Sequence, residues 1–204
     1  MGIIKKINQI TKYKFLNFFV LDAETKTGHK KEYYLASRSK DIEHLRIKSR
    51  SDEPDGVTMF AVTGENRDKV LLVRQYRYPV DDWVYEFPSG IIDEGETYRE
   101  AAIREVKEET GMDFHPIDAD PMYEKARFQT VGLTDEACAI VYGYADGEPS
   151  SALMEDTEEI EVVIADKEEI RRILREEKMA SVCAYQLAHF LYDKEPFAFL
   201  GANE

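Results

Sequence analysis

Residues Gly90–Met112 read GIIDEGETYREAAIREVKEETGM, and this stretch decides the fold of the chain. It matches the pattern G-x5-E-x7-R-E-U-x-E-E-x-G-U, where U is an apolar residue and x is any residue. Because seven positions are fixed, the odds of a chance match in a chain of this length are on the order of one in a million. A solvent-exposed acidic helix would explain neither the two glycines nor the arginine, so we interpret the stretch as a functional motif.

The motif contains the signals of a helix start and a helix end. Thr97 followed by Glu100 three residues later indicates a capping box, in which each side chain accepts a hydrogen bond from the other residue's backbone N–H. Gly111 is a natural stop just after the last turn. The spacing therefore predicts a helix between these residues. A narrow apolar stripe is expected to seat it on a sheet: Tyr98, Ala102 and Val106.

Three carboxylates of this helix share one face. Glu105, Glu108 and Glu109 have the three- and four-residue spacings that place side chains on the same side of a helix. Divalent cations such as Mg²⁺ or Mn²⁺ would remove the repulsion between them, because these ions bind carboxylate oxygens. Arg104 can partner Glu100 or Glu108 and hold a carboxylate in place. The pattern therefore predicts a metal site.

A metal site of this kind suits an anionic substrate such as a diphosphate. An acidic site would bind a diphosphate once two or more metal ions bridge carboxylate and phosphate oxygens. Bound metal also lowers the pKa of a water ligand and stabilises charge in an in-line displacement. We therefore expect water to attack phosphorus, with a further carboxylate as base or water orienter.

Composition excludes several classes of protein. The chain has 204 residues and a net charge of −14, although its first 50 residues carry 12 Lys and Arg against 5 Asp and Glu. An acidic chain is not expected to bind nucleic acid non-specifically, and the basic head is expected to dock on the acidic body, to contact an anionic ligand, or both. No apolar run reaches the ~18 residues of a membrane span. Cys138 and Cys183 are expected to be buried thiols in a reducing cytoplasm.

The order of predicted elements favours an α/β fold with a mixed sheet between helices. Strand patterns occur at residues 13–21, 32–37, 57–63, 69–75, 83–87, 121–128, 137–145 and 159–165. Two helices are expected after the last strand, at 166–177 and 180–193. The first two strands would form a hairpin, and the polar residues 38–56 are expected to be a linker with loops.

The motif and its flanks resemble the ADP-ribose pyrophosphatase branch of the Nudix hydrolases, which use divalent metals to split a diphosphate linked to some group X. The motif is the full signature of that superfamily. The segments that resemble the branch are Val73–Pro79, Tyr85–Gly90, Gly132–Glu136, Ile160–Val163 and the N-terminal hairpin. The resemblance implies the Nudix α/β/α sandwich with a mixed sheet. It also implies a homodimerisation element at 1–50, whose hairpins exchange or cross between subunits, and a Nudix hydrolase domain at 51–204.

The resemblance further implies which residues bind metal. The ligands would be Glu105, Glu109 and the backbone carbonyl of Ser89, with Glu108 and Glu96 as close support. The metal would be Mg²⁺ or Mn²⁺, in two or more ions.

The catalytic residues implied by the resemblance lie partly in an acidic loop. A glutamate of this loop would act on the attacking water, and the alignment puts it at Glu158, with Asp156 and Glu155 as near alternatives. Arg104 is grouped with the catalytic residues because it would hold a carboxylate in place.

Five residues are implied for the substrate. Arg77 and Arg38 would contact the diphosphate, for which the fork of a guanidinium is well suited. Glu86 would lie near the substrate. Phe15 and Tyr33 occupy the places of two aromatic residues that sandwich the adenine across the dimer, although the strand pattern alone would make both ordinary core residues.

The chain departs from the branch at one turn. ADP-ribose-specific members carry a proline in a Ser-Pro-Gly-like turn after the motif, and here Val131 replaces it. We predict hydrolysis of ADP-ribose to AMP and ribose 5-phosphate. The alternatives are another nucleotide-sugar pyrophosphatase, acting on GDP-mannose or with broad specificity, nucleoside triphosphate clean-up, and a non-catalytic ligand-binding Nudix module.

Overall fold

The computed structural model describes residues 1–154 and 159–200. The chain divides into two compact units. The first unit consists of Met1–Asp55 together with Ala126–Cys138, and the second of Gly56–Lys125 together with Ala139–Glu204. The chain thus leaves the first unit after residue 55, returns to it for thirteen residues and leaves it again.

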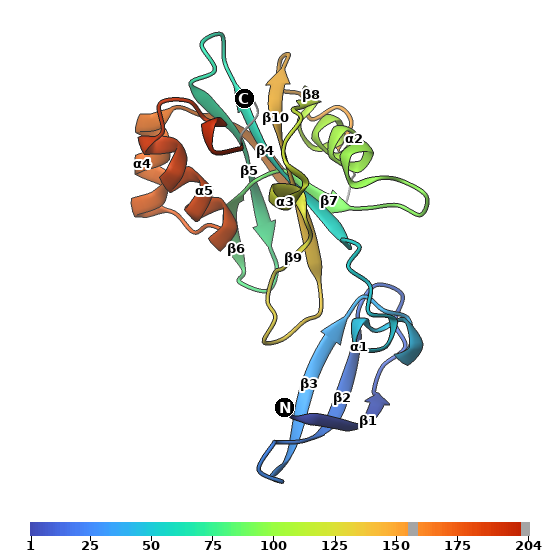
Figure 1. Ribbon diagram of the computed structural model, residues 1–204. Helices are drawn as coiled ribbons and strands as arrows, with labels where there is room; N and C mark the ends of the chain where they lie inside the picture. Colours follow the sequence, from blue (N-terminus) through green and yellow to red (C-terminus); the bar gives the residue numbers. More distant parts are fainter. Residues whose placement is uncertain (155–158, 201–204) are drawn as a thin grey trace. The chain divides into compact units, whose positions relative to one another are not determined.

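The first unit is built on a three-stranded antiparallel sheet in the order β1-β2-β3 (Figure 1). Its strands are β1 (Ile3–Gln9), β2 (Asn17–Glu24) and β3 (Lys30–Ser37). The predicted hairpin is confirmed as β2 and β3, which pair from Asn17↔Ser37 to Glu24↔Lys30. β1 was not predicted, because its apolar and basic residues come in pairs and do not alternate.

One face of this sheet carries the core of the first unit. Phe19, Leu21 and Leu35 are buried together with Leu45. Leu45 lies between two short helices, η1 (Ile42–His44) and α1 (Arg46–Ser49). The segment 38–56 therefore contains helical turns that its polar composition did not predict.

The second unit contains most of the larger sheet, whose main path runs β11-β5-β4-β10-β8 (Figure 1). β6 pairs with β5 and β7 pairs with β4, both antiparallel. The short β9 (Arg127–Phe128) pairs with the first residues of β10, and these residues belong to the first unit. The remaining strands are β4 (Gly56–Thr63), β5 (Lys69–Arg77), β6 (Asp82–Glu86), β7 (Ser89–Ile91), β8 (Asp113–Pro116), β10 (Ala137–Asp146) and β11 (Ile160–Ala165).

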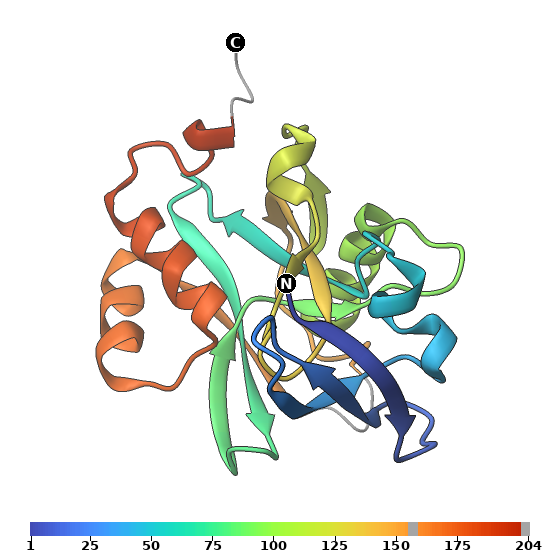
Figure 2. The same cartoon turned by 60° about the horizontal axis from the view of Figure 1, so that its bottom comes forward.

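Helices cover both faces of this sheet (Figures 1 and 2). Alternate residues of β4 point to opposite faces, and all eight are buried. Met59 and Ala61 pack in the core with α2 (Tyr98–Thr110). Phe60 and Val62 pack in the core with α4 (Lys167–Glu176) and α5 (Ser181–Tyr192). The predicted α/β fold with a mixed sheet is confirmed.

The strand predicted at 121–128 is wrong. Residues Pro121–Glu124 form the short helix α3, and only Arg127–Phe128 are extended as β9. Asp120 caps α3 by accepting a hydrogen bond from the Met122 N–H, and Pro121 stands at the first helical position, where its fixed φ suits a helix. A cap and a proline outweighed the aromatic residues that had suggested a strand.

The last described element is a short turn of helix, η2 (Ala198–Leu200). Phe197 and Leu200 are buried in the same core as Phe60. Of the helices in the described part of the chain, none is both long and apolar enough to cross a membrane.

Candidate active site

The motif helix α2 is capped as the sequence predicts. The Thr97 hydroxyl accepts a hydrogen bond from the Glu100 N–H, and the Glu100 carboxylate accepts one from the Thr97 N–H at 2.9 Å. Gly111 ends the helix with φ 73°, in the left-handed region that glycine adopts without strain. The core-facing stripe is broader than predicted, because Ala101 is buried beside Ala102 and Val106.

The first glycine of the motif allows β7 to approach α2 closely. A Cβ atom on Gly90 would lie 1.9 Å from Cδ of Glu105, far inside van der Waals contact. The absence of a side chain at Gly90 therefore lets the Glu105 carboxylate lie against the backbone of β7. This packing explains why the motif needs glycine at a position where the backbone does not have a positive φ.

Arg104 collects three of the motif carboxylates. Its guanidinium donates two hydrogen bonds to Glu96, at 2.9 and 3.0 Å, and one each to Glu105 at 2.8 Å and Glu108 at 3.0 Å. A further hydrogen bond reaches the Ile91 carbonyl. The hydrogen bonds from the Arg104 guanidinium hold the pKa of Glu96 below its ordinary value. Of the two partners predicted for Arg104, Glu108 is confirmed, whereas Glu100 is used in the cap.

Glu109 is the buried carboxylate of the motif. It is 4% exposed, and it accepts a hydrogen bond from the Ser89 N–H at 3.2 Å. The residue predicted to offer a backbone carbonyl to metal is thus next to one of the predicted carboxylate ligands. A buried carboxylate needs a charged or hydrogen-bonding partner, which a cation near Ser89 would also supply.

The chemistry of these side chains fits a hard divalent metal. Glu96, Glu105, Glu108 and Glu109 offer only oxygen donors, which Mg²⁺ and Mn²⁺ prefer. Within the described residues, no three or more His, Cys, Asp or Glu side chains are already arranged to hold one ion. In this arrangement three of the four carboxylates are turned to Arg104, so metal binding would require them to share or release that guanidinium.

In the second unit, Arg77 is paired with Glu86. The guanidinium donates two hydrogen bonds to the carboxylate, at 2.8 and 2.6 Å. Arg77 is the last residue of β5 and Glu86 the last of β6, so the hairpin formed by these two strands carries the pair. The side chain of Glu86 is 15% exposed and that of Arg77 is 42% exposed. Both residues were predicted to lie at the substrate, but their pairing with each other was not predicted.

In the first unit, two of the predicted substrate residues lie beside the segment 129–136: Tyr33 in β3 and Arg38 directly after it. The Tyr33 hydroxyl donates to the Gly132 carbonyl at 2.8 Å, and Arg38 donates to Glu136 at 2.6 Å. Between them the Ala36 N–H donates to the Leu133 carbonyl at 2.9 Å. The turn in which Val131 replaces a proline is therefore fastened along β3.

Phe15 differs from Tyr33 in its surroundings. It precedes β2, and 66% of its surface is exposed. The ammonium group of Lys14 lies 4.7 Å from its ring centre. Phe15 is thus not a core residue of the first unit, contrary to what its strand pattern alone suggests. Tyr33 is partly buried against the core of that unit.

The acidic loop predicted to act on water lies outside the described residues. Glu155, Asp156 and Glu158 all fall in the segment 155–158. The strand β11 that follows the loop is formed as predicted, and it pairs with β5 from Ile160↔Gln75 to Ala165↔Val70.

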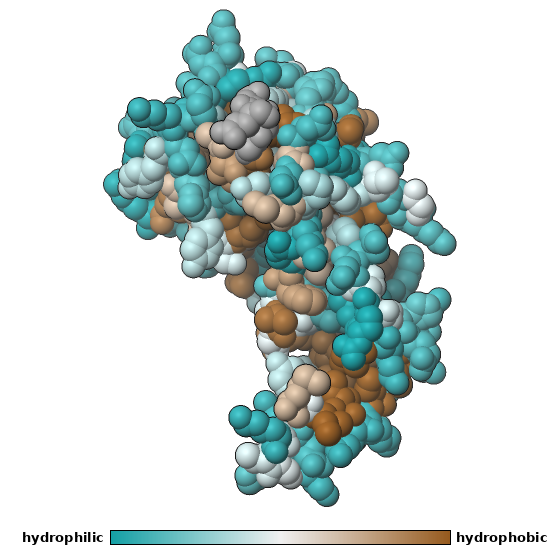
Figure 3. Space-filling view, in the orientation of Figure 1, coloured by the Kyte–Doolittle hydropathy of each residue, from teal (hydrophilic) through white to brown (hydrophobic). Residues whose placement is uncertain are grey.

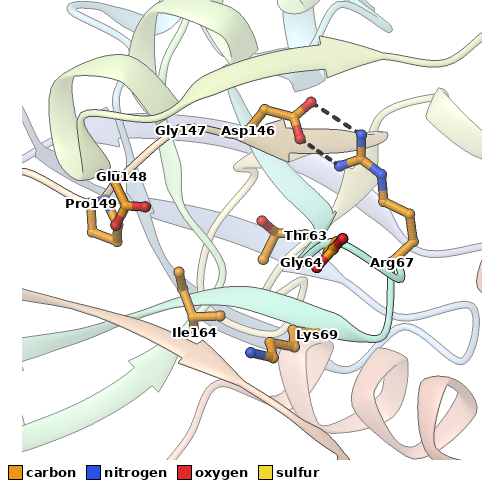
Figure 4. A pocket seen from close by; sticks show the side chains of 10 residues that line it. Thr63, Gly64, Arg67, Lys69, Asp146, Gly147, Glu148, Pro149 and Ile164 are labelled. Carbon is orange, nitrogen blue, oxygen red and sulfur yellow. Dashed lines mark hydrogen bonds and ion pairs between the residues drawn. The ribbon is translucent and has the colours of Figure 1, made fainter.

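A polar pocket of about 400 Å³ in the second unit contains none of the predicted site residues. It lies where β4 turns into β5 (Figure 4). Arg67 points across it and donates two hydrogen bonds to Asp146, at 2.8 and 3.1 Å. Because the guanidinium and the carboxylate satisfy each other, we assign no ligand to this pocket.

Comparison with known proteins identifies the family. The NUDIX domain model matches residues 52–186, and the chain belongs to this family. The recognition of the family from the sequence is confirmed.

Curated relatives cover part of the chain. It is 35% identical over 130 residues to putative nudix hydrolase 2 of Caenorhabditis elegans, covering 61% of this chain and 57% of that protein. It is 34% identical over 121 residues to the ADP-ribose pyrophosphatase of Saccharomyces cerevisiae, covering 57% and 52%. It is 32% identical over 103 residues to the ADP-ribose pyrophosphatase of Bacillus subtilis, covering 50% and 46%. The chain thus spans about half the length of these relatives.

A solved structure shares the fold over nearly the full length. The crystal structure of an ADP compounds hydrolase superimposes with a TM-score of 0.67, covering 99% of this chain and 97% of that one, at 18% sequence identity. At this identity the likeness concerns the fold.

Proposed function

We propose that the chain is a metal-dependent hydrolase of nucleoside diphosphate sugars, with ADP-ribose as its substrate and AMP and ribose 5-phosphate as products. The observation that carries the proposal is the complete motif, in which Arg104 of α2 binds the carboxylates of Glu96, Glu105 and Glu108, and Glu105 lies against Gly90 of β7. Two curated relatives of the chain are ADP-ribose pyrophosphatases. Residues 51–204 would form the hydrolase domain.

Glu105, Glu109 and the Ser89 carbonyl would hold the metal, with Glu108 and Glu96 in support. The hydrogen bond between the Ser89 N–H and Glu109 favours this grouping, as does the close approach of Gly90 to Glu105. Bound Mg²⁺ or Mn²⁺, in two or more ions, would supply charge neutralisation for the diphosphate and acidify a water. Arg104 would keep the supporting carboxylates ionised and oriented.

The proton of the attacking water would pass to a carboxylate of the loop before β11. Glu158 is our first choice, with Asp156 and Glu155 as alternatives. Glu158→Gln is expected to lower turnover more than it lowers metal affinity. If Asp156→Asn has that effect and Glu158→Gln does not, the base is Asp156.

Arg77 and Arg38 would bind the diphosphate, and Phe15 and Tyr33 would stack on the base. Each arginine is held by a carboxylate, Glu86 and Glu136 respectively, which limits its freedom and presents it in one orientation. The 66% exposure of Phe15 leaves its ring open to a flat partner.

We also propose a homodimer formed through residues 1–50. The face of the three-stranded sheet opposite its core exposes Phe18 and Tyr34, by 48% and 65%. Figure 3 shows an apolar patch where β1 and β2 lie in Figure 1. Large exposed apolar patches often mark protein–protein interaction sites.

We further propose a cytoplasmic location. Cys138 and Cys183 are both free thiols, as is usual in a reducing compartment.

The test is phosphate release from the products by a coupled phosphatase, over ADP-ribose, GDP-mannose, UDP-glucose, ADP-glucose, NADH and 8-oxo-dGTP, with Mg²⁺, Mn²⁺ or EDTA. A metal-dependent preference for ADP-ribose supports the proposal. A preference for another nucleotide sugar would leave the proposed reaction unchanged and would change only the proposed substrate. The observation that favours this second candidate is Val131, which replaces the usual proline and is 70% exposed on its turn. Absence of turnover would favour a ligand-binding module.

Glu109→Gln provides the control for the metal assignment. The amide keeps the size of the side chain and removes a ligand charge, so metal-dependent turnover should be lost while the far-UV circular dichroism spectrum stays the same. Activity near that of the wild type would show that Glu109 does not bind metal.

A further inference from the structure

The first turn of α2 rests on a buried carboxylate that the proposed reaction does not use. Glu124, the last residue of α3, is 3% exposed. Its carboxylate accepts one hydrogen bond from the Tyr98 hydroxyl at 3.0 Å and two from Arg99 at 2.9 and 3.1 Å. Tyr98 and Arg99 are the first two residues of α2. The start of the motif helix is thereby fastened to α3.

Arg99 fastens the same helix to the other end of the segment that precedes α3. Its guanidinium donates to the Ile117 carbonyl at 3.1 Å and lies 3.6 Å from the Asp118 carboxylate. The segment 117–124 is therefore attached to the start of α2 at both of its ends. Because Glu124 is only 3% exposed, the loss of Arg99 or Tyr98 as a partner would leave its buried carboxylate less well compensated.

α3 is itself held by aromatic packing. The Tyr123 ring packs edge-on against Phe199, with ring centres 5.6 Å apart, and Phe199 packs against Tyr142 of β10 at 5.5 Å. Edge-to-face pairs of this kind have a defined geometry. Glu124 thus directly follows a residue, Tyr123, that packs through Phe199 onto β10. Its carboxylate can therefore hold the start of α2 at a fixed place relative to the sheet.

The position of α2 matters for metal binding more than for folding. Glu105, Glu108 and Glu109 follow the anchored turn by about two to three helical turns. Metal–oxygen distances are tolerated within about 0.2 Å, so a small rotation or slide of the helix is enough to weaken a metal site. Packing of an apolar helix face tolerates shifts of that size much better.

We propose that Glu124 is a positioning residue for the metal site: through Tyr98 and Arg99, its buried carboxylate sets the rotation and height of α2 and so the placement of the metal-binding glutamates. This inference rests on the proposed function, since it concerns the metal affinity of that same site. Glu124 lies outside the motif, and nothing in its sequence context sets it apart from the many surface glutamates of the chain.

The test measures Mn²⁺ binding to the full chain in the absence of substrate, from the electron paramagnetic resonance signal of free Mn²⁺. Glu124→Gln keeps the shape and removes the charge, and it should raise the Kd for Mn²⁺ about 10-fold, the lower end of the effect of outer-shell partners. Tyr98→Phe removes one hydrogen bond and keeps the ring. It should raise the Kd less, about two- to threefold, and it keeps the test valid if Glu124→Gln fails to fold.

Two control variants separate positioning from general stability. Asp113→Asn breaks the 2.8 Å ion pair with Lys107 near the C-terminal end of the same helix. Ile173→Val removes one methyl group from the core packed against α4 and lowers the melting temperature without touching α2. Both should leave the Kd for Mn²⁺ equal to the wild-type value within the error of the measurement.

The outcomes distinguish this inference from the proposed function. If wild-type protein binds Mn²⁺ and Glu124→Gln binds it equally well despite a lower melting temperature, Glu124 is structural only and the inference is overturned. If Ile173→Val weakens Mn²⁺ binding as much as Glu124→Gln does, the effect is one of stability and the inference is again overturned. If wild-type protein binds no Mn²⁺, the proposed metal site itself fails.

Discussion

Single residues show where the requirements of the site exceed those of the helix that carries it. Thr97, Glu100 and Gly111 would stabilise any helix, whereas Gly90 is explained only by its contact with Glu105. The sequence predicted that both glycines matter, but the reason for Gly90 required coordinates, because its backbone does not have a positive φ that a turn motif could have revealed.

The contact at Gly90 leads to a prediction about Gly90→Ala. The added Cβ would lie 1.9 Å from Cδ of Glu105, so the carboxylate must swing away while the helix, held by its core face, stays in place. We expect metal-dependent turnover to fall about 100-fold, as for loss of a metal-orienting contact, with little change in melting temperature. Kinetics against Mn²⁺ concentration would measure this.

Gly28→Ala is the matched control for that variant. Gly28 has φ 83°, and an added Cβ would meet nothing within 4 Å, so the change should cost about 1 kcal/mol of stability and leave metal activation unaltered. If Gly90→Ala also keeps its full response to Mn²⁺, Glu105 need not lie against β7 for activity.

A second prediction at this scale concerns the Thr134 hydroxyl. It is buried and has no hydrogen-bond partner among the described residues. Thr134→Val replaces the hydroxyl by a methyl group of similar size, so we expect the free energy of unfolding to rise by about 1 kcal/mol. Thr134→Ser, which keeps the hydroxyl and loses the methyl group, should be less stable than the wild type. Urea unfolding measures both, and a loss of stability in Thr134→Val would mean that the hydroxyl has a partner.

Among the elements, the long helices and the strands with a clear apolar period agreed with prediction. α2 has a capping box and a glycine stop, and β4 is a short apolar run that is buried on both faces. α3 was mispredicted because four residues are too few to show a helical period. The aromatic residues of the segment indicated a strand more strongly than the cap and the proline indicated a helix. β1 escaped prediction because its residues do not alternate between apolar and polar, and six of its seven residues are held by pairing with β2, which no local pattern reports.

The cap of α2 can be tested alone. Thr97→Ala removes the hydroxyl that accepts from the Glu100 N–H, and it should lower the free energy of unfolding by about 1 kcal/mol. Thr97→Ser should retain most of that stability, because serine supplies the same acceptor. Chemical denaturation of the three proteins would decide the matter. Equal midpoints for wild type and Thr97→Ala would show that the cap contributes nothing to stability.

At the scale of the whole molecule, the candidate site was predictable in part. The glutamates of the motif could be read from the sequence because they share one helix, whose spacing fixes their common face. The pairing of Arg77 with Glu86, of Arg38 with Glu136 and of Tyr33 with Gly132 could not be read, since each joins segments that only the tertiary fold brings together. The same holds for Glu124.

The proposed dimer gives a prediction for the assembled molecule. Phe18→Asp places a charge on the exposed face of the three-stranded sheet, where burial in an interface would make it costly. We expect a dimer to become a monomer in sedimentation velocity at micromolar concentration. Tyr185→Asp, at a 76% exposed position of α5, is the control and should remain dimeric. A dimer that survives Phe18→Asp would place the interface elsewhere.

The division of the first unit into two chain segments has a consequence for biosynthesis. Residues 1–55 emerge from the ribosome well before residues 126–138, yet both belong to one compact unit. The nascent β3 must therefore wait for the segment to which Tyr33, Ala36 and Arg38 are bonded, while most of the second unit's first half is being made. During that interval the Tyr33 hydroxyl, the Ala36 N–H and the Arg38 guanidinium lack the partners that they have in the folded unit, whereas the apolar core of β2 and β3 can already form within residues 1–55.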